Sequence, residues 1–205
     1  MYPAFGKIQR WNTPINITEK IDGTNGLVYV FDPTKNQDEK DLAPYHVTWA
    51  KVDDQEFGVA AGSRKRWLAP GNDNHEFAQW VSKNAEGLAR LGYGCHYGEW
   101  WGSRINRGYG LVQQDRRFSL FNATRWADIT LGEFGVRGLG VVPILWTGTG
   151  DDLEEGIEMV RSELFAVGSR AMPGYAFPEG FVINHEWSRS RFKVVLRGDE
   201  KKKVG

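Results

Sequence analysis

The sequence predicts an α+β domain of mostly antiparallel sheets with a few flanking helices. Three observations favour this class: many short runs rich in β-branched and aromatic residues, two longer stretches with helical spacing, and no repeat or linker between them. A length of 205 residues with 40% hydrophobic residues suffices for one core. We therefore expect a single domain over residues 1–205.

Eight runs are typical of strands because each is short, apolar and bounded by Gly, Pro, Asn or Asp. In chain order they are residues 15–20, 26–31, 45–51, 94–99, 118–122, 141–146, 180–184 and 191–196.

Two stretches carry apolar residues at three-to-four spacing, which predicts amphipathic helices. The first covers residues 74–91 and ends near Gly92. The second covers residues 151–167, with an acidic first turn that suits the helix dipole and Gly168 just past its end. The charged segment 34–42 lacks an apolar period and is predicted to be a solvated hairpin loop.

The overall charge excludes a strong whole-molecule attraction to polyanions, because 26 basic residues balance 26 acidic ones. The charges are nevertheless segregated. Residues 189–205 form a basic tail with seven cationic side chains, and residues 151–163 carry six carboxylates. The tail is either a solvated face or a local site for a polyanion.

The cysteine count and hydropathy indicate a cytoplasmic protein with no membrane partner. Cys95 is the only cysteine, so neither an intramolecular disulfide nor a thiolate zinc site can form. The longest apolar runs fall far short of the roughly 20 residues that a membrane-spanning helix needs, and the N-terminus lacks the layout of a signal peptide.

Five short segments carry chemical groups at the ends of predicted strands. A lysine followed by an Asp-Gly turn is common by itself. The functional interpretation therefore depends on all five segments occurring together. They are Glu19-Lys20-Ile21-Asp22-Gly23-Thr24-Asn25, the basic turn at 62–66, Gly98-Glu99-Trp100-Trp101-Gly102, Glu179-Gly180-Phe181-Val182-Ile183 and Arg191-Phe192-Lys193.

The residue types suit transfer of a nucleotide to a lysine. A lysine is protonated at neutral pH and must lose its proton to attack phosphorus; Lys193, Arg64 or Arg66 could supply the neighbouring cation that favours this loss. The carboxylates of Glu99 and Glu179 would repel phosphates unless one binds ribose hydroxyls and the other holds a divalent metal ion.

In order and spacing these segments resemble the motifs of the covalent nucleotidyltransferases, the superfamily of polynucleotide ligases and mRNA capping enzymes. They are most similar to the T4 RNA ligase 2-like RNA ligases. The resemblance covers about residues 18–195, including Phe118 to Asn122 as a further motif. It implies a nucleotidyltransferase domain of the DNA ligase type, related in form to ATP-grasp domains, with no C-terminal OB-type domain in this chain.

The resemblance also implies roles for individual residues. Lys20 would form a lysyl-AMP intermediate, with Lys193 on the α-phosphate as a second catalytic residue, and Glu179 would hold the metal. Nucleotide-binding roles would fall to Glu19 on adenine, Asn25 in the pocket, Arg64 and Arg66 on the sugar-phosphate, Glu99 on ribose, Phe121 against the base, and Arg191. Phe118 competes with Phe121, and Lys193 acts either with Arg191 or alone.

The expected function is that of an ATP-dependent RNA ligase using Mg²⁺ or Mn²⁺. AMP would pass from Lys20 to a 5′-phosphate end, and a 3′-hydroxyl would then displace it. RNA ends or nicks are the expected substrates, with a role in RNA repair, and no oligomer is predicted. The alternatives are a ligase for nicks in DNA-containing duplexes, a GTP-using nucleotidyltransferase, or a non-catalytic nucleic-acid-binding relative.

Overall fold

The computed structural model describes residues 8, 10–34, 46–73 and 75–196. Its contacts divide the chain into two compact units. The terminal unit combines Met1–Ile21 with Pro143–Gly205, and the central unit is Asp22–Val142. The single-domain organisation over residues 1–205 stays a prediction.

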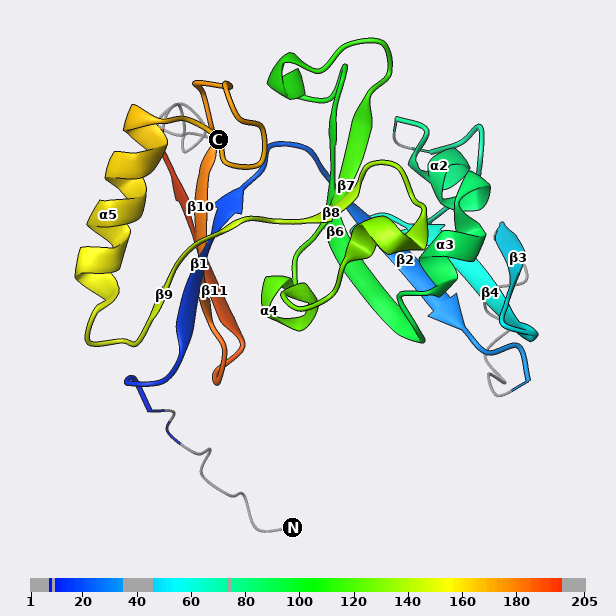
Figure 1. The fold of residues 1–205 in the computed structure, drawn as a ribbon, viewed down its shortest axis with the longest axis horizontal. Coiled ribbons are helices and arrows are strands. Elements are labelled where there is room, and N and C mark those ends of the chain that lie inside the picture. Colours follow the sequence, from blue (N-terminus) through cyan, green and yellow to red (C-terminus); the bar gives the residue numbers. More distant parts are fainter. Residues whose placement is uncertain (1–7, 9, 35–45, 74, 197–205) are drawn as a thin grey trace. The chain divides into compact units, whose positions relative to one another are not determined.

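The terminal unit is a four-stranded antiparallel sheet with one helix (Figure 1). The strand order is β11-β10-β1-β9. The elements are β1 (Ile15–Lys20), β9 (Ile144–Gly148), α5 (Leu153–Ala166), β10 (Gly180–His185) and β11 (Ser190–Val195).

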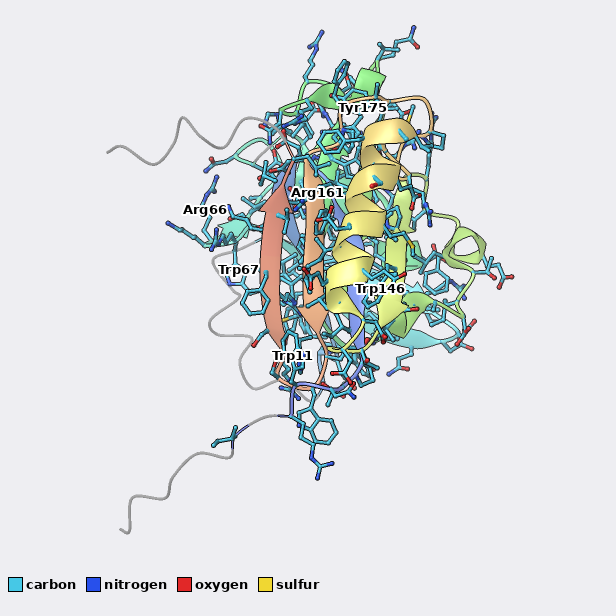
Figure 2. The ribbon with its side chains drawn as sticks, turned by 90° about the vertical axis from the view of Figure 1, so that its left-hand side faces the viewer. Trp11, Arg66, Trp67, Trp146, Arg161 and Tyr175 are labelled. Atoms are coloured by element: carbon cyan, nitrogen blue, oxygen red, sulfur yellow. The ribbon has the colours of Figure 1, made fainter. Side chains whose placement is uncertain are left out.

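Helix α5 covers one face of this sheet, as Figure 2 shows. Buried Ile15, Ile17 and Phe181 pack beneath it with Val160 and Leu164 of the helix. The helix comes close to β9 at Gly156, where a Cβ atom would lie 2.5 Å from the Trp146 ring. Residues alternate along β1, so Asn16, Thr18 and Lys20 project from the face opposite α5.

The central unit is built on a seven-stranded sheet of order β3-β4-β2-β6-β7-β8, with β5 paired to β4. Among the strands described in this unit, β7 and β8 form the one parallel pair. The strands are β2 (Thr24–Phe31), β3 (Val47–Val52), β4 (Gln55–Gly62), β5 (Trp67–Leu68), β6 (Gly94–Gly102), β7 (Arg116–Leu120) and β8 (Leu139–Val141).

Short helices complete the central unit. They are α2 (Phe77–Lys83), α3 (Ala85–Ala89), η1 (Gly108–Gly110), α4 (Ala123–Trp126) and η2 (Leu131–Phe134). Helices α2 and α3 pack against β4 and β3. Phe77 and Leu88 of these helices are buried with Val28, Trp100 and Phe118 of the sheet, and this packing forms the core of the unit.

The predicted fold class is confirmed, since the structure is mixed α+β with mostly antiparallel strands. Each of the eight strand predictions overlaps a strand, but residues 141–146 fall on two of them. Strand β8 ends at Val141, and β9 begins at Ile144 after Pro143, which cannot donate a ladder hydrogen bond.

The helix predicted over 74–91 is two helices separated at Asn84. The Asn84 side chain donates to the Trp80 carbonyl at 2.7 Å, and its φ of −113° lies outside the helical range. The helix predicted over 151–167 is α5. The predicted loop 34–42, beyond Thr34, and the tail from residue 197 lie outside the described residues.

Strands β4 and β5 were not predicted. Gly58, Ala60, Ala61 and Gly62 weaken the apolar signal of β4, since small residues have low strand propensity. No helix in the described part of the chain has the length and hydropathy needed to cross a bilayer.

Candidate functional site

In the terminal unit, Lys20 is the last residue of β1 and lies opposite Gly180 of β10. Its ammonium forms an ion pair with the carboxylate of Glu179, the residue just before β10. The two side chains are 23% and 15% exposed, so both are shielded yet still open to a ligand. The structure therefore brings together the predicted nucleophile and the predicted metal ligand.

Lys193 and Arg191 lie on the same sheet face as Lys20. Lys193 is paired with Val182, which is paired with Thr18, and directly opposed residues share a face. Arg191 occupies the next row, opposite Asn184. Both cations are exposed, so this face offers three positive side chains to an anionic ligand.

Glu19 projects from the other face of β1 and is 1% exposed. Its carboxylate accepts hydrogen bonds from the Ser169 hydroxyl and from the backbone N–H groups of Arg170 and Ala171, the latter two at 2.8 and 2.7 Å. These contacts make Glu19 the anchor of the segment after α5. Its predicted contact with adenine stays a prediction.

Burial raises the pKa of Glu19 above its ordinary value of 4.5, against the opposing effect of its hydrogen bonds. The folded chain therefore holds this proton more tightly than the unfolded chain does. The resulting stability is fully present below pH 4.5 and is lost as pH rises through the raised pKa.

Glu19→Gln cannot titrate, so its free energy of unfolding should lack this pH dependence. The difference, wild type minus variant, is expected to shrink as pH rises from 4.5 through the raised pKa. Urea titrations at several pH values measure it, with Glu154→Gln on α5 as a control for the lost charge. A difference independent of pH would contradict the assignment.

In the central unit, Glu99 links β6 to the start of β2. Its carboxylate accepts from the Gly23 N–H at 3.0 Å and from the Asn25 side chain at 3.1 Å. Asn25 is the register partner of Glu99. The two predicted nucleotide-binding residues are thus in contact, and Glu99, 9% exposed, holds the Gly23 turn.

The turn at Asp22 is fixed by residues that the sequence did not single out. Asn106 donates to the Asp22 carboxylate at 2.9 Å and to the Gly23 carbonyl at 2.6 Å. Arg107 donates to the other carboxylate oxygen at 3.0 Å, and the Asp22 N–H donates to the Tyr109 hydroxyl at 2.9 Å. Gly108 and Gly110 beside Tyr109 are typical of a loop, but no local pattern indicates that this loop contacts Asp22.

The two candidate aromatic residues for base stacking lie in different surroundings. Phe118 is fully buried and packs against Phe77 at a centroid distance of 5.1 Å. Phe121 follows the end of β7, is partly exposed, and donates its N–H to the Tyr97 carbonyl at 2.9 Å. We therefore retain Phe121 as the predicted stacking residue.

Arg64 and Arg66 are exposed in the turn between β4 and β5. The Ser63 N–H donates to the Arg66 carbonyl at 2.8 Å, and the Ser63 hydroxyl accepts from the Arg66 N–H at 3.2 Å. This turn presents its cationic side chains to solvent, and none of them forms an ion pair with another described residue. Their predicted contacts with phosphate would therefore not require an existing ion pair to be broken.

The side chains present fit a metal ion that is held partly by the protein and partly by the phosphates of a bound nucleotide. The described residues contain no group of three or more His, Cys, Asp or Glu side chains arranged for a metal ion. Mg²⁺ commonly uses one or two carboxylates together with water and substrate phosphates. Glu179 is a single carboxylate on a face with three cations. It therefore fits a metal ion shared with substrate phosphates better than a metal ion held by protein ligands alone.

Comparisons with known proteins agree with these motifs. The sequence matches the RNA ligase family over residues 13–195. No curated protein sequence matches the chain.

Solved structures of the Naegleria gruberi RNA ligase share the fold. Two mutants with ATP and Mn match at 16% and 18% identity with TM-scores of 0.52 and 0.53, and the enzyme with PPi matches at 18% with 0.52. In each case 89% of this chain is covered, but it spans only about half the length of the other protein, 48% in the first and 49% in the other two. At these identities the likeness shows the fold alone. The family match extends over most of the sequence and includes all the motif residues from Glu19 to Lys193, so the chain belongs to the RNA ligase family.

Proposed function

We propose that this chain is an ATP-dependent RNA ligase that forms a covalent lysyl-AMP intermediate on Lys20. The observation that carries the proposal is the Lys20–Glu179 pair at the tip of β1, on a sheet face that also bears Lys193 and Arg191. Family membership supports it, as do the ATP and PPi present in structures of the Naegleria gruberi RNA ligase.

The first step of the proposal is attack by the Lys20 amine on the α-phosphorus of ATP. Because an ammonium has no lone pair, Lys20 must lose a proton before it reacts, and its ion pair with Glu179 must break. A nitrogen–phosphorus bond forms, and the bond to the pyrophosphate oxygen breaks. Lys193, with or without Arg191, balances the negative charge on the phosphate oxygens.

Glu179 is the residue proposed to hold Mg²⁺ or Mn²⁺, which would neutralise phosphate charge. In the central unit, Glu99 and Asn25 are proposed to contact ribose and substrate, Phe121 to stack on adenine, and Arg64 and Arg66 to bind sugar-phosphate. The proposed base contact of Glu19 cannot come from its carboxylate, which is held by residues 169–171, and its N–H already donates to the Pro143 carbonyl at 2.9 Å, which leaves its backbone carbonyl.

Two transfers complete the proposed reaction. The oxygen of an RNA 5′-phosphate attacks the lysyl-AMP, which releases Lys20 and forms an RNA–adenylate. A 3′-hydroxyl then attacks the 5′-phosphorus, forming the phosphodiester and releasing AMP. RNA repair and a cytoplasmic location stay predictions.

A gel assay with ATP radiolabelled at the α-phosphate tests the sequence of transfers. With Mg²⁺ or Mn²⁺, the protein is expected to take up label, pass it to a 5′-phosphorylated RNA, and join that RNA to a 3′-hydroxyl end. Labelled GTP and an equivalent DNA nick test the alternatives. Label that reaches the protein but never leaves it would favour a binding relative, and preferential use of GTP or DNA would replace the proposed substrate.

A further inference from the structure

The central unit carries a row of aromatic side chains on the sheet face opposite α2 and α3. We call this the aromatic face and define it by Tyr29, Phe31, Trp49, Trp67 and Tyr97. The register places them on one side: Phe31 and Trp49 are both paired with Gly58, Trp67 with Gly62, and both Gly62 and Tyr97 with Leu27. Tyr29 shares this side with Phe31 because they are two residues apart.

Four of these rings form a continuous series of contacts. Centroids are 5.9 Å apart for Trp49 and Phe31, 5.4 Å for Phe31 and Tyr29, and 5.7 Å for Tyr29 and Trp67. Small residues beneath them allow this packing. The Phe31 ring lies directly on Gly58, where a Cβ atom would come within 2.1 Å of it.

Core packing accounts for Phe31, which is 2% exposed, but not for the ends of the row. Trp49 is 52% exposed and Tyr97 is 56% exposed. From the strand spacing and the rise per residue, these two residues lie roughly 20 Å apart on the sheet. The exposed rings of Trp49 and Tyr97 can each accept a stacked base, since every base has an aromatic face.

The charge next to the aromatic face is complementary to a phosphate backbone. The turn just before Trp67 contains Arg64, Lys65 and Arg66, all exposed. Figure 2 labels Arg66 and Trp67 beside one another. At the far end, near Trp49, the exposed Lys51 is paired with Asp54, so the excess of positive charge lies at the end with Trp67.

The same face continues to the proposed nucleotide-binding residues. Asn25 and Glu99 are two residues beyond Leu27 and Tyr97 on their strands, and the Phe121 N–H bonds to the Tyr97 carbonyl. A strand lying on the aromatic face would therefore lead toward the residues proposed to bind the adenylate.

We propose that the aromatic face binds single-stranded RNA, with bases stacked on the exposed rings of Trp49 and Tyr97 and with a phosphate held by the exposed Lys65. This inference rests on the proposed function, because it names how the substrate strand is held. Aromatic rings beside a basic segment are the usual means of binding single strands with little sequence preference.

Fluorescence anisotropy with a labelled single-stranded RNA of about 12 nucleotides tests the inference. Trp49→Ala and Tyr97→Ala are each expected to bind at least about fivefold more weakly than wild type, and Trp49→Phe should recover most of the affinity. Trp187→Ala is the matched control, since Trp187 is 62% exposed but lies in the terminal unit; it should bind like wild type.

The salt dependence gives a second readout. Lys65→Ala should reduce the slope of log affinity against log salt by about 0.7, the value for one phosphate contact on a single strand. An unchanged slope, together with wild-type affinity for Trp49→Ala and Tyr97→Ala, would overturn the inference. The same holds if Trp49→Ala only lowers the melting temperature, which would indicate that this ring serves packing and not RNA binding.

Uptake of label from ATP distinguishes an error in the aromatic-face inference from an error in the proposed ligase function. Trp49→Ala is expected to take up label normally while losing RNA affinity. If wild type takes up no label, the proposed ligase function is wrong. If wild type and Trp49→Ala both take up label and bind RNA equally, only the aromatic-face inference is wrong.

Discussion

Lys20→Ala is expected to lose all covalent label from ATP, because no other group in the proposal supplies the attacking amine. Lys20→Arg should lose it as well. The guanidinium keeps the positive charge next to Glu179 but does not deprotonate, so it cannot attack phosphorus. The measurement is the rate of label incorporation over a long incubation with ATP and Mg²⁺.

Lys20→Arg also controls for folding, since it preserves the ion pair that alanine removes. Lys51→Ala, which removes an exposed lysine of β3 paired with Asp54, should incorporate label at the wild-type rate. Wild-type labelling of Lys20→Arg would show that another residue is the nucleophile.

Phe118→Ala is expected to lower stability, whereas Phe121→Ala is expected to lower nucleotide binding. Phe118 is fully buried among Phe77 and Trp80, so its truncation should cost about 3–5 kcal/mol of stability and lower the melting temperature by on the order of 10 °C. Phe121→Ala should leave the melting temperature much closer to wild type. Its affinity for ATP should fall by about fivefold or more, as expected for the loss of one base stack.

Thermal melts and equilibrium ATP binding on the same preparations measure both effects. Phe121→Trp should retain the affinity, since it still offers a ring to the base. If Phe121→Ala unfolds as readily as Phe118→Ala and binds ATP like wild type, the stacking residue lies elsewhere.

The sequence predicted the elements whose local pattern is strong. Strand β1 was predicted with its observed bounds because its β-branched residues end at Lys20 before an Asp-Gly turn. Strand β4 was not predicted because Gly58 and Gly62 have no side chain that could contribute to a strand pattern. The reason for those glycines is the packing of Phe31 and Leu27 from β2, which no local pattern contains.

The candidate site shows the same limit. Glu19 and Lys20 are adjacent in sequence and were expected to bind one nucleotide, but strand alternation sends their side chains to opposite faces. The anchors of Glu19 and Asp22 were missed since they are distant in sequence. Ser169 lies 150 residues from Glu19, and Asn106 lies 84 residues from Asp22.

The predicted site residues that lie in contact share a strand register or a strand end. Glu179 and Lys20 meet because β10 begins where β1 ends. Asn25 and Glu99 meet because β2 and β6 are adjacent and antiparallel. Motif order along the chain could indicate these pairs, but the contacts themselves come from the sheet topology.

Mass spectrometry of the protein after incubation with ATP and Mg²⁺ tests whether Lys20 carries the adenylate. The expected result is an intact mass increased by one AMP, and fragmentation that places the adduct on Lys20. Absence of an adduct under turnover conditions, or an adduct on Lys193 or any other residue, would contradict it.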